Sequence, residues 1–167
     1  MTTIKRIAVV LGCNGLLSIL LVALNRSLAH YSCHLFVPAL FLIYPTLFLP
    51  LRPGLIAVGL AAAFIEANLP VPIGSFVFLA LGFALLVNRY RHRLRSEQLQ
   101  YSISLALVMN LFFFSGVSIL APVNLPFRLL TDFLLSSITV ALLSGWFLSL
   151  QHASLILLRS KPRPDEF

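Results

Sequence analysis

The sequence predicts an all-α membrane protein: a polytopic helical bundle of six transmembrane helices with both termini in the cytoplasm. The first observation behind this prediction is composition. Apolar residues make up 59% of the 167 residues and charged residues only 10%, against about 45–50% and about 25% in soluble domains. Five acidic and twelve basic side chains are too few to cover a soluble domain of this length, which excludes a soluble enzyme. The apolar excess also excludes a disordered chain.

The second observation is a series of six apolar runs, each near or above the length needed to cross about 30 Å of hydrocarbon at about 1.5 Å per residue. We expect spans over residues 7–24, 35–51, 54–69, 73–88, 99–120 and 129–151. They make residues 1–167 a single integral-membrane domain. The sixth run continues to 158, and we expect Gln151 and His152 to mark its inner interface, with the rest lying along the headgroups.

The third observation is the distribution of basic residues. With six spans and cytoplasmic termini, Arg26 and Arg128 lie outside and the other ten of the twelve lie inside. Cytoplasmic loops of membrane proteins collect Lys and Arg, so this asymmetry supports both the orientation and the even number of spans. The ten inner residues are Lys5, Arg6, Arg52, Arg89, Arg91, Arg93, Arg95, Arg159, Lys161 and Arg163.

The first run has the flanks of a signal peptide but not its length. Lys5 and Arg6 precede it, and Ser27-Leu28-Ala29 resembles a small-x-small cleavage site. The run over 7–24 is longer than the apolar region of about 7–15 residues in signal peptides. We therefore expect it to remain as the first span.

The second run is crowded with prolines, at positions 38, 45, 50 and 53. Each proline inside a helix removes a hydrogen bond and favours a kink. We expect a bent helix whose concave face could hold a ligand or a partner helix.

The third and fourth runs are rich in small residues, and we expect these two helices to form the buried centre of the bundle. Gly59 and Ala63 make a small-xxx-small pair that allows close backbone approach. Both runs are short and are joined only by Pro70-Val71-Pro72, so a re-entrant hairpin is the alternative to two full spans.

Asn14 and Asn110 lie near the middle of the first and fifth spans. We expect each to hydrogen-bond to a neighbouring helix, at about 0.6–2 kcal/mol per contact. A transport role is the alternative to this packing role.

Recognisable catalytic and metal motifs are absent from the sequence. Nothing matches G-x-S-x-G, H-E-x-x-H or C-x-x-C. His30, Cys33 and His34 have a spacing that could hold a divalent metal, but a fourth ligand is missing nearby, so we interpret them as a wet interfacial loop. We expect no enzymatic activity, no catalytic residue, no cofactor and no metal.

Two carboxylates fall at membrane depth near the outer side: Glu66 at the end of the third span and Asp132 at the start of the sixth. Such groups are costly there and are usually compensated by a partner. Arg128 lies one turn from Asp132 and can pair with it. Glu66 would then pair with Arg26, join a network shared with Arg128, or be protonated and neutral. The alternative is that Glu66 snorkels to outer water.

Arg89, Arg91, Arg93 and Arg95 form a basic cluster after the fourth span, alternating with Tyr90 and His92. Basic residues near a membrane surface attract anionic headgroups. We expect a cytoplasmic anchor, and a docking site for a cytoplasmic filament is the alternative.

Residues 38–74 resemble the rod-shape-determining protein MreD family of the bacterial cell-elongation machinery. Arg52-Pro53-Gly54 matches the family's basic-Pro-Gly turn, Glu66 stands at its acidic position, and Pro72-Ile73-Gly74 supplies the Pro-x-Gly that follows. The basic cluster after the fourth span also fits. The chain departs from the family pattern in having Glu rather than Asp at 66 and Ala62-Ala63 in place of Gly-Leu. From residue 99 onward only the hydropathy is similar.

The resemblance implies a non-enzymatic scaffold in the bacterial cytoplasmic (inner) membrane. It implies binding to an MreC-like single-span membrane protein, and a connection between MreB filaments and the peptidoglycan synthases RodA and its penicillin-binding partner. The family's bundle is also similar to the S components of energy-coupling-factor transporters. The alternative function is therefore a substrate-binding S component or another small-molecule transporter subunit. Such a subunit should show an outer pocket with several aligned polar side chains.

Overall fold

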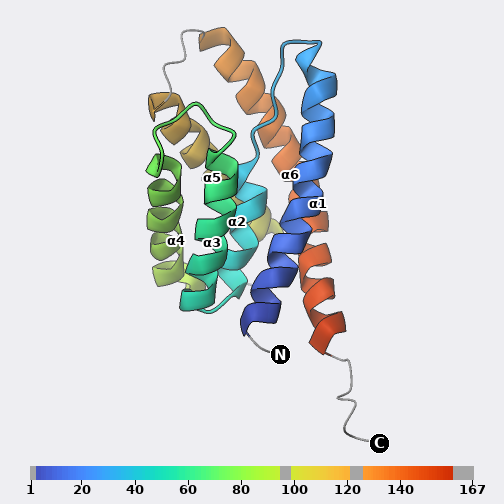
Figure 1. Ribbon diagram of the computed structural model, residues 1–167, viewed down its shortest axis with the longest axis vertical. Helices are drawn as coiled ribbons and strands as arrows, with labels where there is room; N and C mark the ends of the chain where they lie inside the picture. Colours follow the sequence, from blue (N-terminus) through green and yellow to red (C-terminus); the bar gives the residue numbers. More distant parts are fainter. Residues whose placement is uncertain (1–2, 95–98, 121–125, 160–167) are drawn as a thin grey trace, which may run out of the picture.

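The computed structural model describes residues 3–94, 99–120 and 126–159, and within these ranges every regular element is a helix (Figure 1). The all-α class is confirmed. Three segments, Ile4–Ala29, Ser102–Leu120 and Leu130–Ile156, are long and apolar enough to cross a membrane, which indicates a membrane protein. In chain order the helices are α1 (Thr3–Ala29), α2 (Pro38–Phe48), α3 (Leu51–Glu66), α4 (Ser75–Leu94), α5 (Leu99–Leu120) and α6 (Pro126–Arg159).

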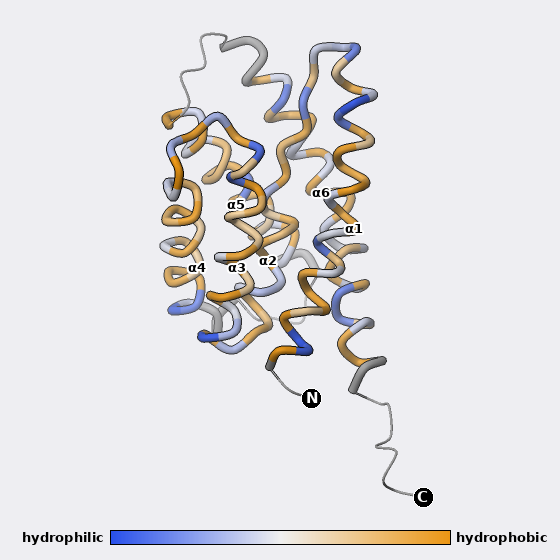
Figure 2. Tube along the Cα trace, viewed as in Figure 1, coloured by the Kyte–Doolittle hydropathy of each residue, from blue (hydrophilic) through white to orange (hydrophobic). Residues whose placement is uncertain are grey.

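Successive helices run in opposite directions, so α1 begins and α6 ends at the same end of the bundle (Figure 1). We call this the terminal end. The opposite end, which carries the connections over residues 30–37 and 67–74, is the loop end. Hydrophobic residues colour most of the length between them, and hydrophilic stretches lie mainly at the two ends (Figure 2). This distribution suits a bundle whose middle lies in hydrocarbon.

The centre of the bundle is α2, which packs against all five other helices. Every residue from Pro38 to Leu47 is buried. Leu60 and Phe64 of α3, in contrast, are 52% and 58% exposed. The expectation that the third and fourth spans form the centre was wrong. Small residues allow one face to approach a neighbour closely, whereas a helix that is apolar all round, as α2 is, can be buried on every side.

Prolines define both ends of α2. Pro38 lies in its first turn, where a missing N–H costs no helical hydrogen bond. At the other end Leu49 is extended, the conformation that a following proline favours, and Pro50 comes next. The helix therefore has only 11 residues, or about 16 Å. Residues 35–37 of the predicted second span are not helical.

The last helix, α6, continues without a break for 34 residues. Gln151 is fully buried, and its Nε2 donates a hydrogen bond of 3.1 Å to Asn14 Oδ1 on α1. Its Oε1 is buried without a hydrogen-bond partner in the described part of the chain. That Gln151 and His152 mark the inner interface stays a prediction. The neighbouring His152 is exposed, and its ring centre lies 6.4 Å from that of Phe48.

Candidate functional site

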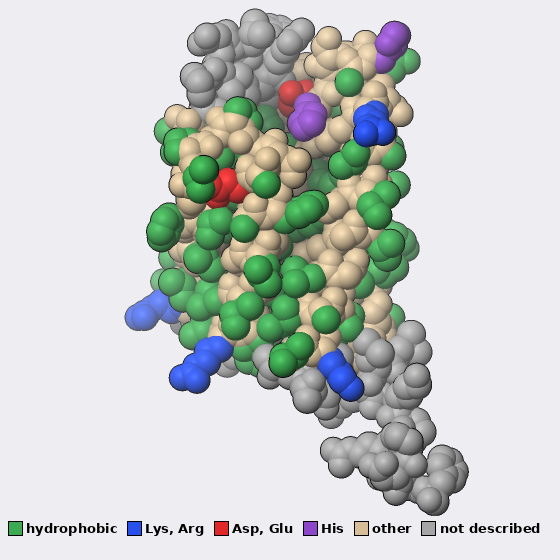
Figure 3. All heavy atoms as spheres, in the orientation of Figure 1, with side chains coloured by type: hydrophobic (Ala, Val, Ile, Leu, Met, Phe, Trp, Pro, Cys, Tyr) green, Lys and Arg blue, Asp and Glu red, His purple; other side chains and the backbone are tan. Residues whose placement is uncertain are grey.

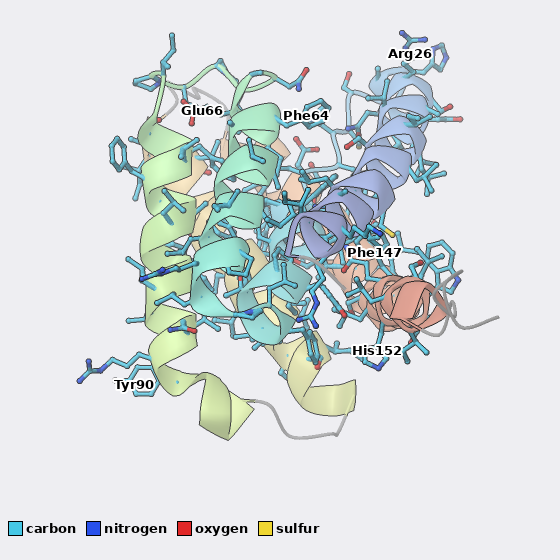
Figure 4. All side chains as sticks on the ribbon, turned by 60° about the horizontal axis from the view of Figure 1, so that its bottom comes forward. Arg26, Phe64, Glu66, Tyr90, Phe147 and His152 are labelled. Carbon is cyan, nitrogen blue, oxygen red and sulfur yellow. The ribbon has the colours of Figure 1, made fainter. Side chains whose placement is uncertain are left out.

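A cleft of about 470 Å³ opens at the loop end between α1, the segment that leads into α2, and the end of α3. We call it the α1–α3 cleft. Its volume falls within the range of about 300–1,000 Å³ that is usual for small-molecule sites. Phe64 of α3 points toward α1, and Arg26 lies near the end of α1 (Figure 4). The polar residues in the lining are Ser18, Asn25, Arg26, His34 and Asn68.

One wall of the α1–α3 cleft is irregular backbone whose N–H groups are bonded to side chains. The N–H of His34 donates to Asp132 Oδ1 at 2.9 Å. The N–H of Leu35 donates to Asn25 Oδ1 at 2.7 Å, and that of Phe36 to Ser136 Oγ at 2.9 Å. Non-helical backbone at membrane depth is tolerated only where its polar groups are satisfied or line a cavity. Side chains of α1 and α6 thus hold this wall in place.

Asn25 makes a two-point contact with Leu35. Besides accepting the Leu35 N–H, its Nδ2 donates to the Leu35 carbonyl oxygen at 3.1 Å. One amide that both donates to and accepts from the same residue fixes the orientation of its own side chain. The distance between α1 and the irregular wall is therefore set by the protein and needs no ligand.

Asn14 joins three helices one turn below Ser18. Its Nδ2 donates to the carbonyl oxygen of Phe41 on α2 at 3.1 Å, and its Oδ1 accepts from Gln151 on α6. The expected interhelical role of Asn14 is confirmed. Asn110 does not behave as expected: both its amide atoms are buried without a hydrogen-bond partner in the described part of the chain.

Glu66 joins the end of α3 to the start of α4 (Figure 4). Its Oε1 accepts from the N–H of Gly74, and its Oε2 accepts from the N–H of Val77 at 2.9 Å. The first N–H groups of a helix have no intrahelical acceptor, and a negative charge there is favourable. Glu66 is therefore a cap for α4.

Gly74 is suited to this contact by its backbone, whose φ is +89°. Residues other than glycine rarely adopt that backbone conformation. The acidic position and the glycine on which the family resemblance rests are thus bonded to each other.

No family model, no curated protein and no solved structure matches this chain.

Pairing with Arg26, one of the possibilities left open for Glu66, was wrong. Both carboxylate oxygens face backbone N–H groups, and Arg26 lies on α1, away from Glu66 (Figure 4). The snorkelling alternative was also wrong, because the Glu66 side chain is only 8% exposed. The side chain of Arg128 lies outside the described part of the chain, so its pairing with Asp132 stays a prediction.

The close approach of α3 to α2 depends on Gly54. A Cβ added to Gly54 would lie 2.8 Å from the carbonyl oxygen of Pro45, closer than real Cβ contacts. At Gly59 a Cβ would meet only Leu81 Cδ2, at 3.8 Å, and Ala63 is exposed. Gly59 and Ala63 therefore do not form the expected close contact. Small residues occur on several faces of α3, and the buried face is the one that carries Ala57, Ala61 and Ala62.

Among the basic residues whose side chains are described, all except Arg26 belong to the terminal end (Figure 3). They are Lys5, Arg6, Arg52 and Arg89, at the starts of α1 and α3 and near the end of α4. Arg91 and Arg93 lie on α4 with side chains outside the described part. Arg95 lies outside the described residues altogether.

The first loop brings no metal-binding group together in the described ranges, where no three His, Cys, Asp or Glu residues are placed to hold an ion. The ring of His30 lies edge-on to Tyr31, with ring centres 5.7 Å apart. Cys33 Sγ donates to the Tyr31 carbonyl oxygen at 3.5 Å. His34 lies apart from these contacts, in the wall of the α1–α3 cleft.

Sequence reasoning missed the α1–α3 cleft and the roles of Asn25 and Ser136 in its wall. Asn25 precedes an arginine near a predicted span end, a pattern that indicates an ordinary interfacial residue. A serine inside a helix usually bonds to the preceding turn. Asn25 instead bonds to backbone ten residues later, in the segment that leads into α2. Ser136 bonds to backbone 100 positions away, which no local pattern reveals.

Proposed function

We propose that this chain is a non-enzymatic membrane scaffold of the bacterial cell-elongation complex, similar to the MreD family, which binds an MreC-like single-span protein. The observation that supports it most directly is the contact between Glu66 and Gly74. These two positions, with the Arg52-Pro53-Gly54 turn, carry the resemblance. Each has a structural task here, since Gly54 admits the Pro45 carbonyl and Glu66 caps α4. The resembling residues therefore build one unit of α2, α3 and α4.

In this proposal all six helices cross the inner membrane, and the terminal end faces the cytoplasm. The four described basic side chains at that end support the orientation, because positive residues collect on the cytoplasmic side. The short α2 fits a full crossing if the irregular segment before it completes the path. The three side-chain acceptors for the N–H groups of residues 34–36 support that path, since they remove the cost of non-helical backbone in the membrane.

One observation favours a second candidate, a small-molecule transporter subunit. The α1–α3 cleft lies at the loop end, which this orientation places on the outer side, and five polar side chains line it. That is where a substrate-binding subunit needs its pocket. Such a subunit would assemble with a pair of ATPases rather than with a single-span scaffold partner.

Co-purification tests the two candidates against each other. The tagged chain is isolated from its native membranes after brief cross-linking, and bound proteins are identified by mass spectrometry. We expect a single-span protein with a periplasmic domain. Recovery of an ATPase pair without it would replace the scaffold proposal by the transporter one. As a matched pair, Glu66→Leu should lose the partner and Asn68→Leu should keep it. Asn68 is exposed just after α3, and its side chain donates only to the carbonyl oxygen of Phe64, one turn earlier.

A further inference from the structure

We propose that the α1–α3 cleft binds one anionic phospholipid, with the phosphate at Arg26 and an acyl chain along the apolar walls. This inference concerns the occupant of the cleft and does not depend on the scaffold proposal. It rests on three features of the described residues: the charge at the mouth, the apolar depth and the preformed walls.

The charge at the mouth is positive and uncompensated by any residue of the lining. Arg26 is exposed there, and no Asp or Glu lines the cleft. Two carboxylates elsewhere in the described bundle already accept backbone N–H groups: Glu66 from Gly74 and Val77, and Asp132 from His34. A guanidinium presents donors in a planar fork that matches a phosphate. Arg26 therefore selects an anionic group for this position.

Apart from Arg26, Ser18, Asn25, His34 and Asn68, the lining of the cleft is apolar, and this larger part selects hydrocarbon. Its walls include Leu21 and Val22 of α1, Phe41 of α2, Phe64 and Ile65 of α3, and Leu69. Wall atoms that face empty space lose dispersion contacts. An acyl chain restores these contacts, and the bilayer supplies such chains at the place where the cleft lies.

The walls exist without a ligand. Asn25 holds Leu35 by two hydrogen bonds, and Asp132 and Ser136 hold the residues on either side of it. Binding to a preformed site avoids the cost of ordering a loop. A single lipid is thus distinguished from the general layer of lipids around the helices.

Two other occupants fit less well. A free phosphate ion would use Arg26 and leave the apolar walls uncovered. A partner helix is about 10 Å wide, so a single turn of it fills about the whole cleft volume. A spanning helix therefore cannot lie inside the cleft, whereas one flexible chain can.

Native mass spectrometry of the full chain in detergent tests the proposal, with phosphatidylglycerol and phosphatidylcholine of identical acyl chains as probes. We expect wild type to retain one phosphatidylglycerol in preference to phosphatidylcholine. Arg26→Gln should lower that preference about tenfold, because a charge-assisted contact is lost. Arg52→Gln, which changes an exposed arginine at the terminal end, should leave it unchanged.

A second pair of variants tests the cleft itself. Val22→Trp, or Ala29→Trp if the first variant does not fold, fills the lining and should remove the retained lipid. Ile19→Trp is the control, because Ile19 is 70% exposed on the same helix and does not line the cleft. Thermal unfolding in detergent verifies that each variant is folded.

Three results would overturn the proposal. The first is an unchanged lipid preference in both Arg26→Gln and the filled variant, which would assign the lipid to the general surface. The second is equal retention of phosphatidylcholine by wild type, which would remove the anionic selectivity. The third is displacement of the lipid by inorganic phosphate alone, which would make this a site for a free anion.

Discussion

Asn14 donates a hydrogen bond of 3.1 Å to the carbonyl oxygen of Phe41, an acceptor that Pro45 leaves without its helical donor. In a regular helix that carbonyl would accept the N–H four residues later, and proline has none. The Asn14 amide fills the gap from another helix, and its oxygen then accepts from Gln151. One proline in the central helix is thus compensated by side chains of the first and last helices.

This relationship predicts the cost of removing the amide. Asn14→Leu should lower the free energy of unfolding by about 1–3 kcal/mol, because it leaves the Phe41 carbonyl and the Gln151 amide without partners. The thermal unfolding midpoint in detergent measures the effect.

The same relationship predicts a strong coupling between Asn14 and Pro45. Pro45→Ala restores an N–H to the Phe41 carbonyl, so Asn14→Leu should cost less in that background than in wild type. A double-mutant cycle on unfolding midpoints measures this coupling. Equal costs in the two backgrounds would show that Asn14 does not replace the missing donor.

Glu66 is predicted to act through the two N–H groups of α4. Glu66→Leu should destabilise by about 1–3 kcal/mol, because both N–H groups become buried without an acceptor. Glu66→Gln keeps one acceptor oxygen and should be milder. Arg26→Gln should add independently to either change in a cycle, since the two residues are not paired. Strong coupling between them would contradict the capping role.

Gly54 is predicted to tolerate no side chain. Gly54→Ala places a Cβ 2.8 Å from the Pro45 carbonyl oxygen, which is too close for these atoms, so α2 and α3 must separate. Forcing extra atoms into a packed contact costs about 1–3 kcal/mol. Gly12→Ala is the matched control, because a Cβ there meets nothing within 4 Å. The unfolding midpoints of the two variants in detergent measure the difference. Equal midpoints would contradict the prediction.

Reporter fusions test the membrane topology. Fusions after Glu97 and at Phe167 should report a cytoplasmic location, and a fusion after Val123 a periplasmic one. Six crossings with the terminal end inside produce this pattern, because the basic residues then concentrate in the cytoplasm. A periplasmic signal at Phe167 would require an odd number of crossings.

Part of the fold could be read from local patterns because hydrocarbon thickness and helix propensity act on neighbouring residues. Helix α5 covers the same residues as the fifth apolar run, 99–120. The prolines before and after α2 mark its ends, since each acts on the backbone beside it. The composition excluded a soluble protein, because the number of charged side chains is known without their positions in space.

The sequence by itself determined that this is a helical membrane protein, where its apolar runs lie and that Asn14 needs an interhelical partner. Only the tertiary structure decided that α2 is central, that Glu66 caps α4, and that Asn25, Asp132 and Ser136 hold the wall of the α1–α3 cleft. Asn14 and Gln151 are 137 positions apart, and His34 and Asp132 are 98 apart. A polar residue in a span indicates that a partner is needed, because an unsatisfied group there is costly. Asn14 has such partners, whereas Asn110 has none among the described residues. Which group supplies the bond depends on proximity in space, and that is set by the packing of all six helices.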